Sequence, residues 1–511
     1  MKEPDVTCDN ADSSVVRLKL DTADRVALWT ALGTAIEEYV GDADELPASV
    51  SISAVEVEQA LDAFDFDTPM SPHTALSQVM HALRVLQPHV RHARHFGLFD
   101  AAPTTMGVVG DTLAAVFNPC LSSWRGSPFG VGTERRLVTI FGRRFGYAER
   151  HSDGLLTTGG SEANFTALLL ALTARFPTHH ARGMRGIDAQ PVVYLTDQVH
   201  PSARRAVAMA GLGTDAVRVV PVDESLRMDP RGLEELIRSD RAAGLVPLLV
   251  TATAGTTGAG TIDPIAEVAD VARRHGVWLH VDAAWGGAAA LLPKPNSAFD
   301  GLPRADSITF DAHKWMSVPI GAGMLLTRHR GLLTETFRVS PGFLSAEDIH
   351  SIDPLGRSMR WSRDFAGLKI LLSLAVAGWC GYEQTWREQI RLGDELRNRL
   401  RSDGWRPVND TPLPVVCFVD ELSQAGTDET HLDLIAHEVN SSGRATTFRV
   451  RIGGQPALRA CITNYATTSD DITTLVGLLD EARTRVGSGA MDGSMFHTGE
   501  PVGTCQARWS M

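Results

Sequence analysis

The sequence predicts an α/β fold in which a mostly parallel sheet is covered by helices on both faces. Between about residues 150 and 330, short apolar runs rich in β-branched residues alternate with helical stretches. This alternation is typical of parallel strands joined by crossover helices. The chain has 511 residues, which is too long for one simple core and favours two or three packed units. Functional side chains are expected where the strands end, at the carboxyl edge of the sheet.

The expected elements follow in chain order. Residues 1 to about 105 have an amphipathic helical pattern that prolines interrupt at positions 47, 69, 72 and 88. The strands expected in the sheet are Val192–Thr196, Val217–Val222, Pro247–Thr253, Val277–Asp282, Ser307–Phe310 and Met324–Thr327. The helices expected among them include Ser161–Arg175, Pro230–Ala243 and Ile265–His275.

A second, smaller unit is expected after the sheet. Beyond Phe365 a long helical pattern runs towards residue 400, and an α+β unit follows it. Its candidate strands are Val415–Val419, Thr446–Ile452 and Ala460–Asn464. The end of the chain is rich in Gly, Ser and Thr, which is typical of a flexible tail. We therefore expect an N-terminal helical segment over 1–105, a large domain over 106–390, a small domain over 391–486 and a tail over 487–511.

Composition and charge narrow the class of protein. The formal net charge of −13 argues against a general binder of nucleic acid or of anionic membranes. The start of the chain has no secretory signal pattern, and no apolar run approaches the roughly 18 residues of a membrane span. The six cysteines are scattered without a Cys-x-x-Cys pair, as in a reduced cytoplasmic protein. His89, His92 and His95 lie three apart, but no further ligand completes a metal site, so no metal is expected.

A glycine-rich turn before an apolar helix is a candidate phosphate site. The sequence Leu156-Thr-Thr-Gly-Gly-Ser-Glu-Ala-Asn164 places Gly160 and Ser161 where a helix begins. Glycines expose backbone N–H groups in a tight turn, and the positive end of a helix attracts anions. A plain Gly-Gly turn with a serine cap fits this motif alone at least as well, because the lysine of a Walker motif is missing.

An acid and small residues follow one of the buried strands. In His280-Val-Asp-Ala-Ala284, Asp282 stands at the strand's carboxyl end. A carboxylate there can pair with a pyridinium nitrogen and keep the ring able to accept electrons, and Ala284 leaves room for a flat ring. A helix N-cap or a metal ligand is the alternative for this segment.

A lysine and a histidine are expected at the same sheet edge. Lys314 follows another strand in Asp311-Ala-His-Lys-Trp315, where it can attack an aldehyde, and His313 beside it can reach a phosphate. His200 ends Thr196-Asp-Gln-Val-His200 and can lie flat on a ring or pass protons. A solvated lysine and a capped loop histidine are the ordinary alternatives. The glycine-rich turn, the histidine, the acid and the lysine occur in this order, each at a strand end. This combination indicates a cofactor site far more specifically than any one of the four motifs alone.

These motifs resemble those of the group II pyridoxal-phosphate-dependent decarboxylases, which act on aromatic amino acids, glutamate, histidine and diaminobutyrate. The resemblance spans roughly residues 70 to 485. It is carried by the segments quoted above and by Thr253-Ala-Gly-Thr-Thr257, His95-Phe-Gly-Leu-Phe99 and Trp361-Ser-Arg-Asp-Phe-Ala-Gly-Leu-Lys369. It implies the aspartate-aminotransferase-like fold, called fold type I, with a mostly parallel seven-stranded sheet. It also implies a homodimer with active sites at the subunit interface and the N-terminal segment packed on the partner.

The resemblance implies a role for each candidate residue. Lys314 is expected to form a Schiff base with pyridoxal 5′-phosphate, Asp282 to pair with the ring nitrogen and His200 to stack on the ring. The phosphate is expected to lie on Gly160, Ser161 and His313. The remaining cofactor contacts are expected from Thr253 and Ala284, and the substrate contacts from Arg459 and Phe99. The implied reaction releases carbon dioxide and an amine from an L-amino acid.

The sequence departs from the family on a loop and in the substrate region. Many members carry a tyrosine on a mobile loop after the lysine, but none occurs between Arg328 and Gly356, where the nearest aromatic residues are Phe337 and Phe343. Protonation by His200 and an oxygen-consuming side reaction are the two hypotheses that follow. Leu98, Asp100 and Ala101 replace a larger set in aromatic-specific members, so an aromatic substrate is not favoured. Arg459 is weakly consistent with a small acidic substrate. A substrate that is tethered to a carrier protein is a further alternative.

Two other functions compete with decarboxylation. The first is another pyridoxal-phosphate reaction on the same scaffold, such as decarboxylation-coupled oxidative deamination, carbon–carbon lysis or transamination. The second is a catalytically silent homologue that serves as a binding subunit. Because Lys314, Asp282 and His200 are all present, an enzyme is favoured over a silent protein.

Overall fold

The computed structural model describes residues 18–338 and 353–488, and its centre is a seven-stranded sheet. The strand order is β1-β7-β6-β5-β4-β2-β3. β7 runs antiparallel to both of its neighbours, and the other neighbouring pairs are parallel. The strands are β1 (Asp153–Thr157), β2 (Pro191–Leu195), β3 (Val217–Val219), β4 (Val246–Thr253), β5 (Trp278–Asp282), β6 (Ser307–Asp311) and β7 (Gly323–Thr327). The mostly parallel sheet expected from the sequence is confirmed, and β1 is a strand that the sequence analysis missed.

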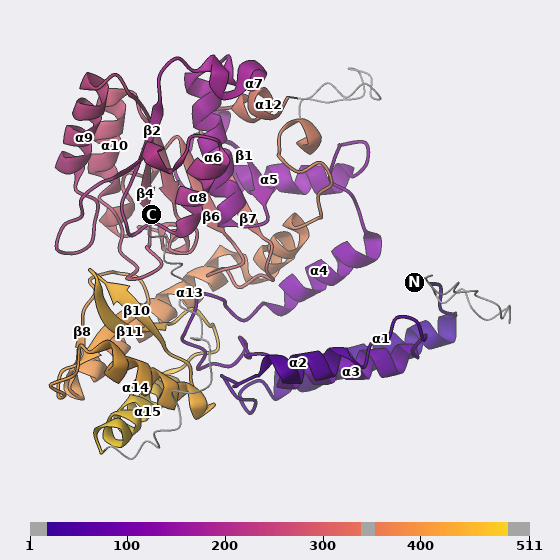
Figure 1. Ribbon diagram of the computed structural model, residues 1–511. Coiled ribbons are helices and arrows are strands. Elements are labelled where there is room, and N and C mark those ends of the chain that lie inside the picture. The colour runs from indigo at the N-terminus through magenta and orange to yellow at the C-terminus, as the bar shows by residue number, and fades with distance from the viewer. Residues whose placement is uncertain (1–17, 339–352, 489–511) are drawn as a thin grey trace, which may run out of the picture.

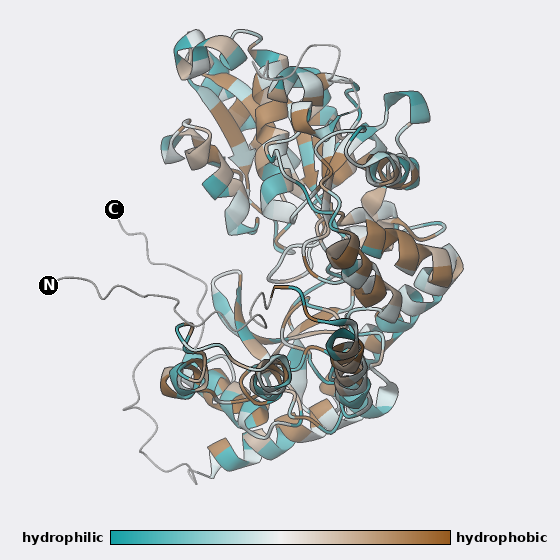
Figure 2. Cartoon of the chain, turned by 90° about the vertical axis from the view of Figure 1, so that its right-hand side faces the viewer, coloured by the Kyte–Doolittle hydropathy of each residue, from teal (hydrophilic) through white to brown (hydrophobic). Residues whose placement is uncertain are grey.

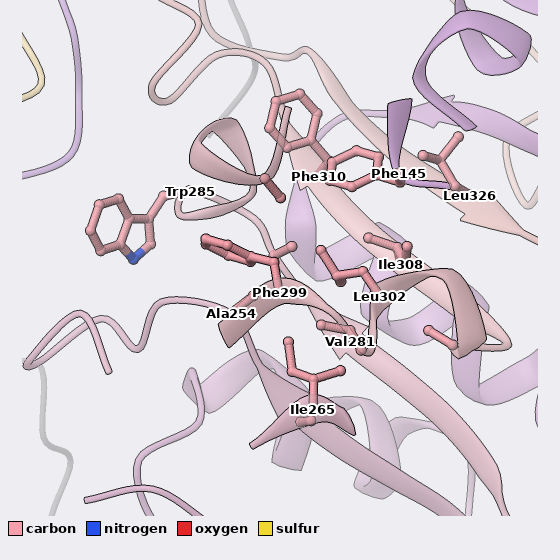
Figure 3. Packing of buried hydrophobic residues seen from close by; sticks show 14 of the residues in the cluster. Phe145, Ala254, Ile265, Val281, Trp285, Phe299, Leu302, Ile308, Phe310 and Leu326 are labelled. Atoms are coloured by element: carbon pink, nitrogen blue, oxygen red, sulfur yellow. The ribbon is translucent and has the colours of Figure 1, made fainter. Parts of the chain in front are cut away.

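Both faces of this sheet are buried. Along β2, Val192 and Tyr194 belong to one hydrophobic cluster, whereas Val193 and Leu195 belong to another. Because successive side chains of a strand point to opposite faces, each cluster is the core on one side of the sheet. Figure 3 shows the larger cluster around Val281, Ile308 and Phe310. Figure 2 shows that the strands of this sheet are apolar along much of their length.

Helices supply the other wall of each cluster (Figure 1). α6 packs against the sheet on the side of the smaller cluster, and α5, α9 and α10 contact it on the side of the larger one. The helices of this part are α4 (Thr105–Phe117), α5 (Pro128–Arg144), α6 (Gly160–Arg175), α7 (His179–Arg182), α8 (Pro201–Met209), α9 (Pro230–Ala242), α10 (Ile265–His275), α11 (Gly287–Ala290) and α12 (Leu332–Phe337).

A four-stranded antiparallel sheet follows, in the order β10-β11-β9-β8. Its strands are β8 (Trp405–Pro407), β9 (Val415–Asp420), β10 (Phe448–Ile452) and β11 (Gln455–Cys461). Its helices are α13 (Gly367–Ser402), α14 (Glu429–Ser441) and α15 (Ser469–Gly487). The long helix expected beyond Phe365 forms, but it bends at Gly378, whose φ is 60°. The last candidate strand was placed too late in the chain, because β11 spans Gln455–Cys461 and not Ala460–Asn464.

The N-terminal helices lie on the outside of the subunit (Figure 1). They are α1 (Thr22–Gly41), α2 (Ala54–Leu61) and α3 (Pro72–Val85), and none of their residues is buried. Pro72 occupies the first turn of α3, where its missing N–H costs nothing. None of the helices in the described ranges combines the length and apolar composition that crossing a membrane requires.

Candidate active site

The carboxyl edge of the large sheet brings the candidate residues together. β4 ends at Thr253 and β5 ends at Asp282, and these two residues are paired across the strands. Asp282 is also paired with Thr309 of β6, and Lys314 follows that strand by three residues. Since parallel strands end at the same edge, residues far apart in the sequence meet here.

Asp282 is a buried carboxylate with a donor on each oxygen. Its Oδ2 accepts a hydrogen bond of 2.8 Å from Asn164 Nδ2, and its Oδ1 accepts one of 3.1 Å from the backbone N–H of Ala284. The residue is only 7% exposed. Hydrogen bonds to both oxygens offset part of the cost of burying a carboxylate. This carboxylate is therefore prepared to face a cationic group.

Lys314 reaches the site from a turn that a tryptophan anchors. Trp315 is buried and donates a hydrogen bond of 2.6 Å to Gln389 of α13. The ammonium Nζ of Lys314 lies 3.1 Å from Asp311 Oδ2, and the lysine side chain is 27% exposed. The amine is thus held at the site while it remains accessible to a small molecule.

His313 and the glycine turn lie against each other. The backbone N–H of Ala322 donates to His313 Nδ1 over 3.2 Å, and burial lowers the pKa of this imidazole, opposed by the charge of Asp311. A Cβ on Gly159 would come within 3.3 Å of His313, and one on Gly160 within 3.0 Å of Asp311 Oδ2. Side chains larger than hydrogen would therefore fill the space above the start of α6.

The N-terminus of α6 meets the requirements of an anion site. The helix begins at Gly160, and its N-cap Gly159 provides no side-chain cap to the first-turn N–H groups. Ser161 in this turn is exposed to solvent. Glu162 is turned away, because its carboxylate accepts from the N–H and the hydroxyl of Thr158. The free N–H groups and the helix dipole favour a phosphate here.

His200 is placed by the first turn of α8, where it is the N-cap residue. The backbone N–H of Ser202 donates to His200 Nδ1 over 3.3 Å, and Ser202 Oγ lies 2.8 Å from the same nitrogen. Because a backbone N–H can only donate, Nδ1 is the acceptor and the proton of the neutral ring is on Nε2. Desolvation lowers the pKa of His200, although Asp282 acts in the opposite direction. His200 is exposed to solvent.

Thr253 carries a polar atom that lacks a partner. Its Oγ1 is buried and makes no hydrogen bond to the part of the chain that the structure describes. Its backbone N–H donates to Asp263 Oδ2 over 2.7 Å. A buried hydroxyl without a partner is costly, so a bound group with an acceptor or donor there is favoured. Together with the glycine turn and the small Ala284, this orphaned hydroxyl fits a flat, phosphorylated ring.

Arg459 and Phe99 lie together on the small-sheet side. Arg459 Nη1 donates to the carbonyl of Thr257 over 2.5 Å, and Nη2 donates to that of Gly97 over 2.8 Å. The guanidinium carbon lies 5.2 Å from the centre of the Phe99 ring, and that ring stacks on Trp285 at 4.2 Å. Arg459 is 5% exposed. Its terminal nitrogens are therefore committed to the protein, and a role in binding substrate stays a prediction.

A group of buried polar residues behind Asp282 was not predicted from the sequence. They are Asn164, His280, Ser307 and Thr309, and all are less than 6% exposed. A signal was available, since His280 is a polar residue inside an otherwise apolar strand. Asn164, however, gains its meaning only when α6 is packed on β5 and β6. Across the described ranges, no group of three or more His, Cys, Asp or Glu residues is arranged to hold a metal ion.

Known proteins share this sequence pattern and fold. The pyridoxal-dependent decarboxylase conserved domain matches residues 58–420. An aromatic-L-amino-acid decarboxylase from Bacillus atrophaeus is 32% identical over 395 residues, which are 75% of this chain and 80% of that protein. The crystal structure of mouse CSAD has 26% identity and a TM-score of 0.84, covering 91% of this chain and 99% of that one. The structure of Oryza sativa TDC with PLP and tryptamine has 23% identity and a TM-score of 0.85, with the same coverage.

Proposed function

Because this chain belongs to the pyridoxal-dependent decarboxylase family, we propose that it converts an L-amino acid to its amine and carbon dioxide, with Lys314 as the residue that holds the cofactor. The cofactor is pyridoxal phosphate. The observation that carries the proposal is that an accessible amine, a buried carboxylate and an imidazole share one sheet edge with a glycine turn. When bound, pyridoxal phosphate supplies an aldehyde and a ring that accepts the electrons released with carbon dioxide.

Each residue has a task that its surroundings support. Lys314 would hold the cofactor through its side-chain amine, which lies at the site and is partly exposed. Asp282 is a buried carboxyl group with a donor on each oxygen, so its carboxylate can hold a proton on the ring nitrogen. His200 carries its proton on Nε2 and desolvation favours its neutral form, so its ring can lie flat against the cofactor. Once the ring takes up a proton from solvent, its imidazolium form can donate Nε2–H to the substrate carbon and return to the neutral form. The N-terminus of α6 and His313 are suited to the phosphate.

The charges near the substrate favour a cationic side chain. Asp100 follows Phe99, is exposed and makes no ion pair or hydrogen bond to another described residue. Its segment is tied to the site at both ends, because Arg459 donates to Gly97 and Thr104 donates to the carbonyl of Ser317, three residues after Lys314. The exposed charge beside the site is thus negative, whereas Arg459 is buried and donates from both terminal nitrogens to backbone carbonyls. We infer a diamino acid in preference to an acidic or aromatic one.

Product analysis tests the function. The holoenzyme is supplied with the twenty standard amino acids and with diamino acids, and amine, carbon dioxide and hydrogen peroxide are measured. We expect an amine and carbon dioxide in equal amounts, and none from Lys314→Ala. Lys294→Asn is the matched control, since Lys294 is exposed and asparagine tolerates its positive φ of 55°. An aldehyde formed together with hydrogen peroxide would identify the oxidative alternative. Phe343, on the loop segment that lacks the family's tyrosine, lies outside the described residues.

Substitution of Asp100 tests the substrate class separately. Asp100→Asn should raise KM for the preferred diamino acid by about fivefold, the upper end for one exposed charge pair, and leave kcat within about twofold. An unchanged KM for that substrate would disprove the inferred substrate class but not the decarboxylation itself.

A carrier-bound substrate is tested by comparing free amino acids with the same amino acids bound as thioesters to a carrier protein. If only the thioester is consumed, the substrate is tethered.

We propose that the enzyme is a homodimer and that its N-terminal helices pack on the partner. α1 to α3 bury none of their residues in the subunit, and Trp29 is 55% exposed. An open hollow of about 600 Å³ between α1 and α3 is lined mainly by apolar side chains, including Trp29 and Leu76. Apolar patches of this kind mark protein contacts. Light scattering should give twice the chain mass, and Trp29→Glu should shift it towards the monomer; a wild-type monomer at micromolar concentration would contradict the proposal.

A further inference from the structure

A row of hydrogen bonds runs through the buried core behind Asp282. His280 and Asp282 alternate along β5, and the register pairs them with Ser307 and Thr309 of β6. Alternate residues of a strand point to the same face, so these four side chains share one side of the sheet. That side is the one filled by the smaller hydrophobic cluster, which includes Trp278. Polar groups in such a place are costly unless each finds a partner.

Asn164 is the junction of this row. Its Nδ2 donates to Asp282 Oδ2 over 2.8 Å and to Ser202 Oγ over 3.2 Å. Its Oδ1 accepts from Thr309 Oγ1 over 2.8 Å and lies 2.9 Å from His280 Nε2. An ionised carboxylate only accepts, so the amide nitrogen must face Asp282 and the amide oxygen must face His280. All four hydrogen-bonding positions of this amide are used.

The orientation of Asn164 fixes the proton on His280. Since Asn164 Oδ1 is an acceptor, His280 Nε2 must be the donor. Nδ1 is then the acceptor of the neutral ring, and Ser307 Oγ, 2.8 Å away, donates to it. Ser307 Oγ in turn accepts from Trp278 Nε1 over 2.9 Å. Burial lowers the pKa of His280 to about 4, so the ring is neutral at physiological pH.

Every donor in the row therefore points towards Asp282. The order runs from Trp278 through Ser307 and His280 to Asn164 and ends on the carboxylate. Hydrogen bonds in a chain polarise one another, and those that end on a charge are the strongest. A second branch leads from Asn164 through Ser202 to His200 Nδ1. One amide thus orients both groups that the proposed function places on the cofactor ring.

We propose that Asn164 and His280 are positioning residues that hold the Asp282 carboxylate through hydrogen bonds and aim it at the cofactor ring nitrogen. This rests on the proposed function of Asp282. Neither residue is expected to touch the substrate. Their effect should appear in the affinity for the cofactor even when no reaction takes place.

The test compares the cofactor dissociation constant of matched variants in the absence of substrate. Asn164→Leu removes the donor to Asp282 at similar volume and should raise the dissociation constant of pyridoxal phosphate by about tenfold or more, the scale of a hydrogen bond to a charge. His280→Gln keeps a donor near the position of Nε2 and should stay within about threefold of wild type. His280→Leu has no donor and should be weaker than the glutamine variant.

Folding and binding are separated by measuring the thermal unfolding of each apoprotein. A lower unfolding temperature with an unchanged dissociation constant for Asn164→Leu would reduce this residue to a structural role and overturn the proposal. Equal constants for the two His280 variants would do the same. Should Asn164→Leu fail to fold, neutron diffraction of the wild-type holoenzyme decides: deuterium belongs on His280 Nε2, and deuterium on Nδ1 would reverse the row. A wild-type protein that binds no cofactor would instead refute the proposed function.

Discussion

The charge of Asp282 is the property of a single residue on which the chemistry depends most. Its two oxygens accept hydrogen bonds from Asn164 and from the backbone of Ala284, so asparagine would keep the size of the side chain but turn its NH2 group towards one of these donors. Asparagine cannot hold a proton on a ring nitrogen, because it carries no charge. The substitution Asp282→Asn therefore removes the charge and one accepted hydrogen bond while the size of the side chain stays the same.

Asp282→Asn should lower kcat by about a hundredfold or more at saturating cofactor, the loss expected when a preorganised electrostatic partner is removed. The dissociation constant of the cofactor should change less than kcat. Steady-state rates in added pyridoxal phosphate measure both. Asp215→Asn is the control, since Asp215 is exposed and comes just before β3, at the amino edge of the sheet and not at the carboxyl edge that carries the site. A rate within tenfold of wild type would show that Asp282 is not the partner of the ring.

At the scale of elements, the bounds of helices and strands were predicted best where the apolar pattern and the residues that start or end an element agree. Ile265–His275 was predicted to the residue, because its apolar face is regular and Gly276 with φ of 56° ends it. β11 was misplaced because Gly453 and Gly454, with φ of 55° and 81°, make a two-residue hairpin. That turn pairs Ile452 with Gln455, so the strand starts at a polar residue that carries no strand signal.

The site residues predicted from the sequence are those that follow strands. The residues that were missed depend on how a helix packs against the sheet. Lys314, Asp282 and His200 could be named because each follows an apolar run. Asn164 could not, since an asparagine inside a helix is an ordinary polar residue until the helix is packed on a sheet. β1 was missed because only two of its five residues are large and apolar.

The turn between β1 and α6 should tolerate no side chain at Gly160 without loss of cofactor affinity. Gly160→Ala places a Cβ 3.0 Å from Asp311 Oδ2 and 3.5 Å from the Cβ of Ala284. The neighbours must shift by a few tenths of an ångström in the space proposed for the phosphate. We expect the dissociation constant of pyridoxal phosphate to rise by about tenfold with little change in apoprotein stability. Gly477→Ala in α15 is the control, because nothing lies within 4 Å of its new Cβ and alanine favours the helix. Equal cofactor affinities in both variants would argue against a phosphate at this turn.

At the scale of the whole molecule, buried histidines couple stability to pH. Burial lowers the pKa of both His92 and His280 to about 4. Their unfolded pKa is about 6.5, so the unfolded chain binds protons that the folded protein rejects. Stability is then full above pH 6.5 and falls with decreasing pH by about 1.4 kcal/mol per unit for each such histidine. Asp263 acts the other way below pH 6, because burial raises its pKa to about 6 and its folded form takes up a proton.

The histidine contribution should dominate between pH 7.5 and 5.5. We expect the free energy of unfolding in urea to be lower by about 1 to 2 kcal/mol at the lower pH, at one fixed protein concentration. His92→Asn keeps an acceptor for the N–H of Arg94, which donates to His92 Nδ1 over 3.0 Å, but removes the titrating ring. This variant should lose about 1 kcal/mol of the pH dependence, whereas His437→Asn, at an exposed position, should lose none. The same pH dependence in all three proteins would mean that carboxylates, and not buried neutral histidines, set the acid limit of this fold.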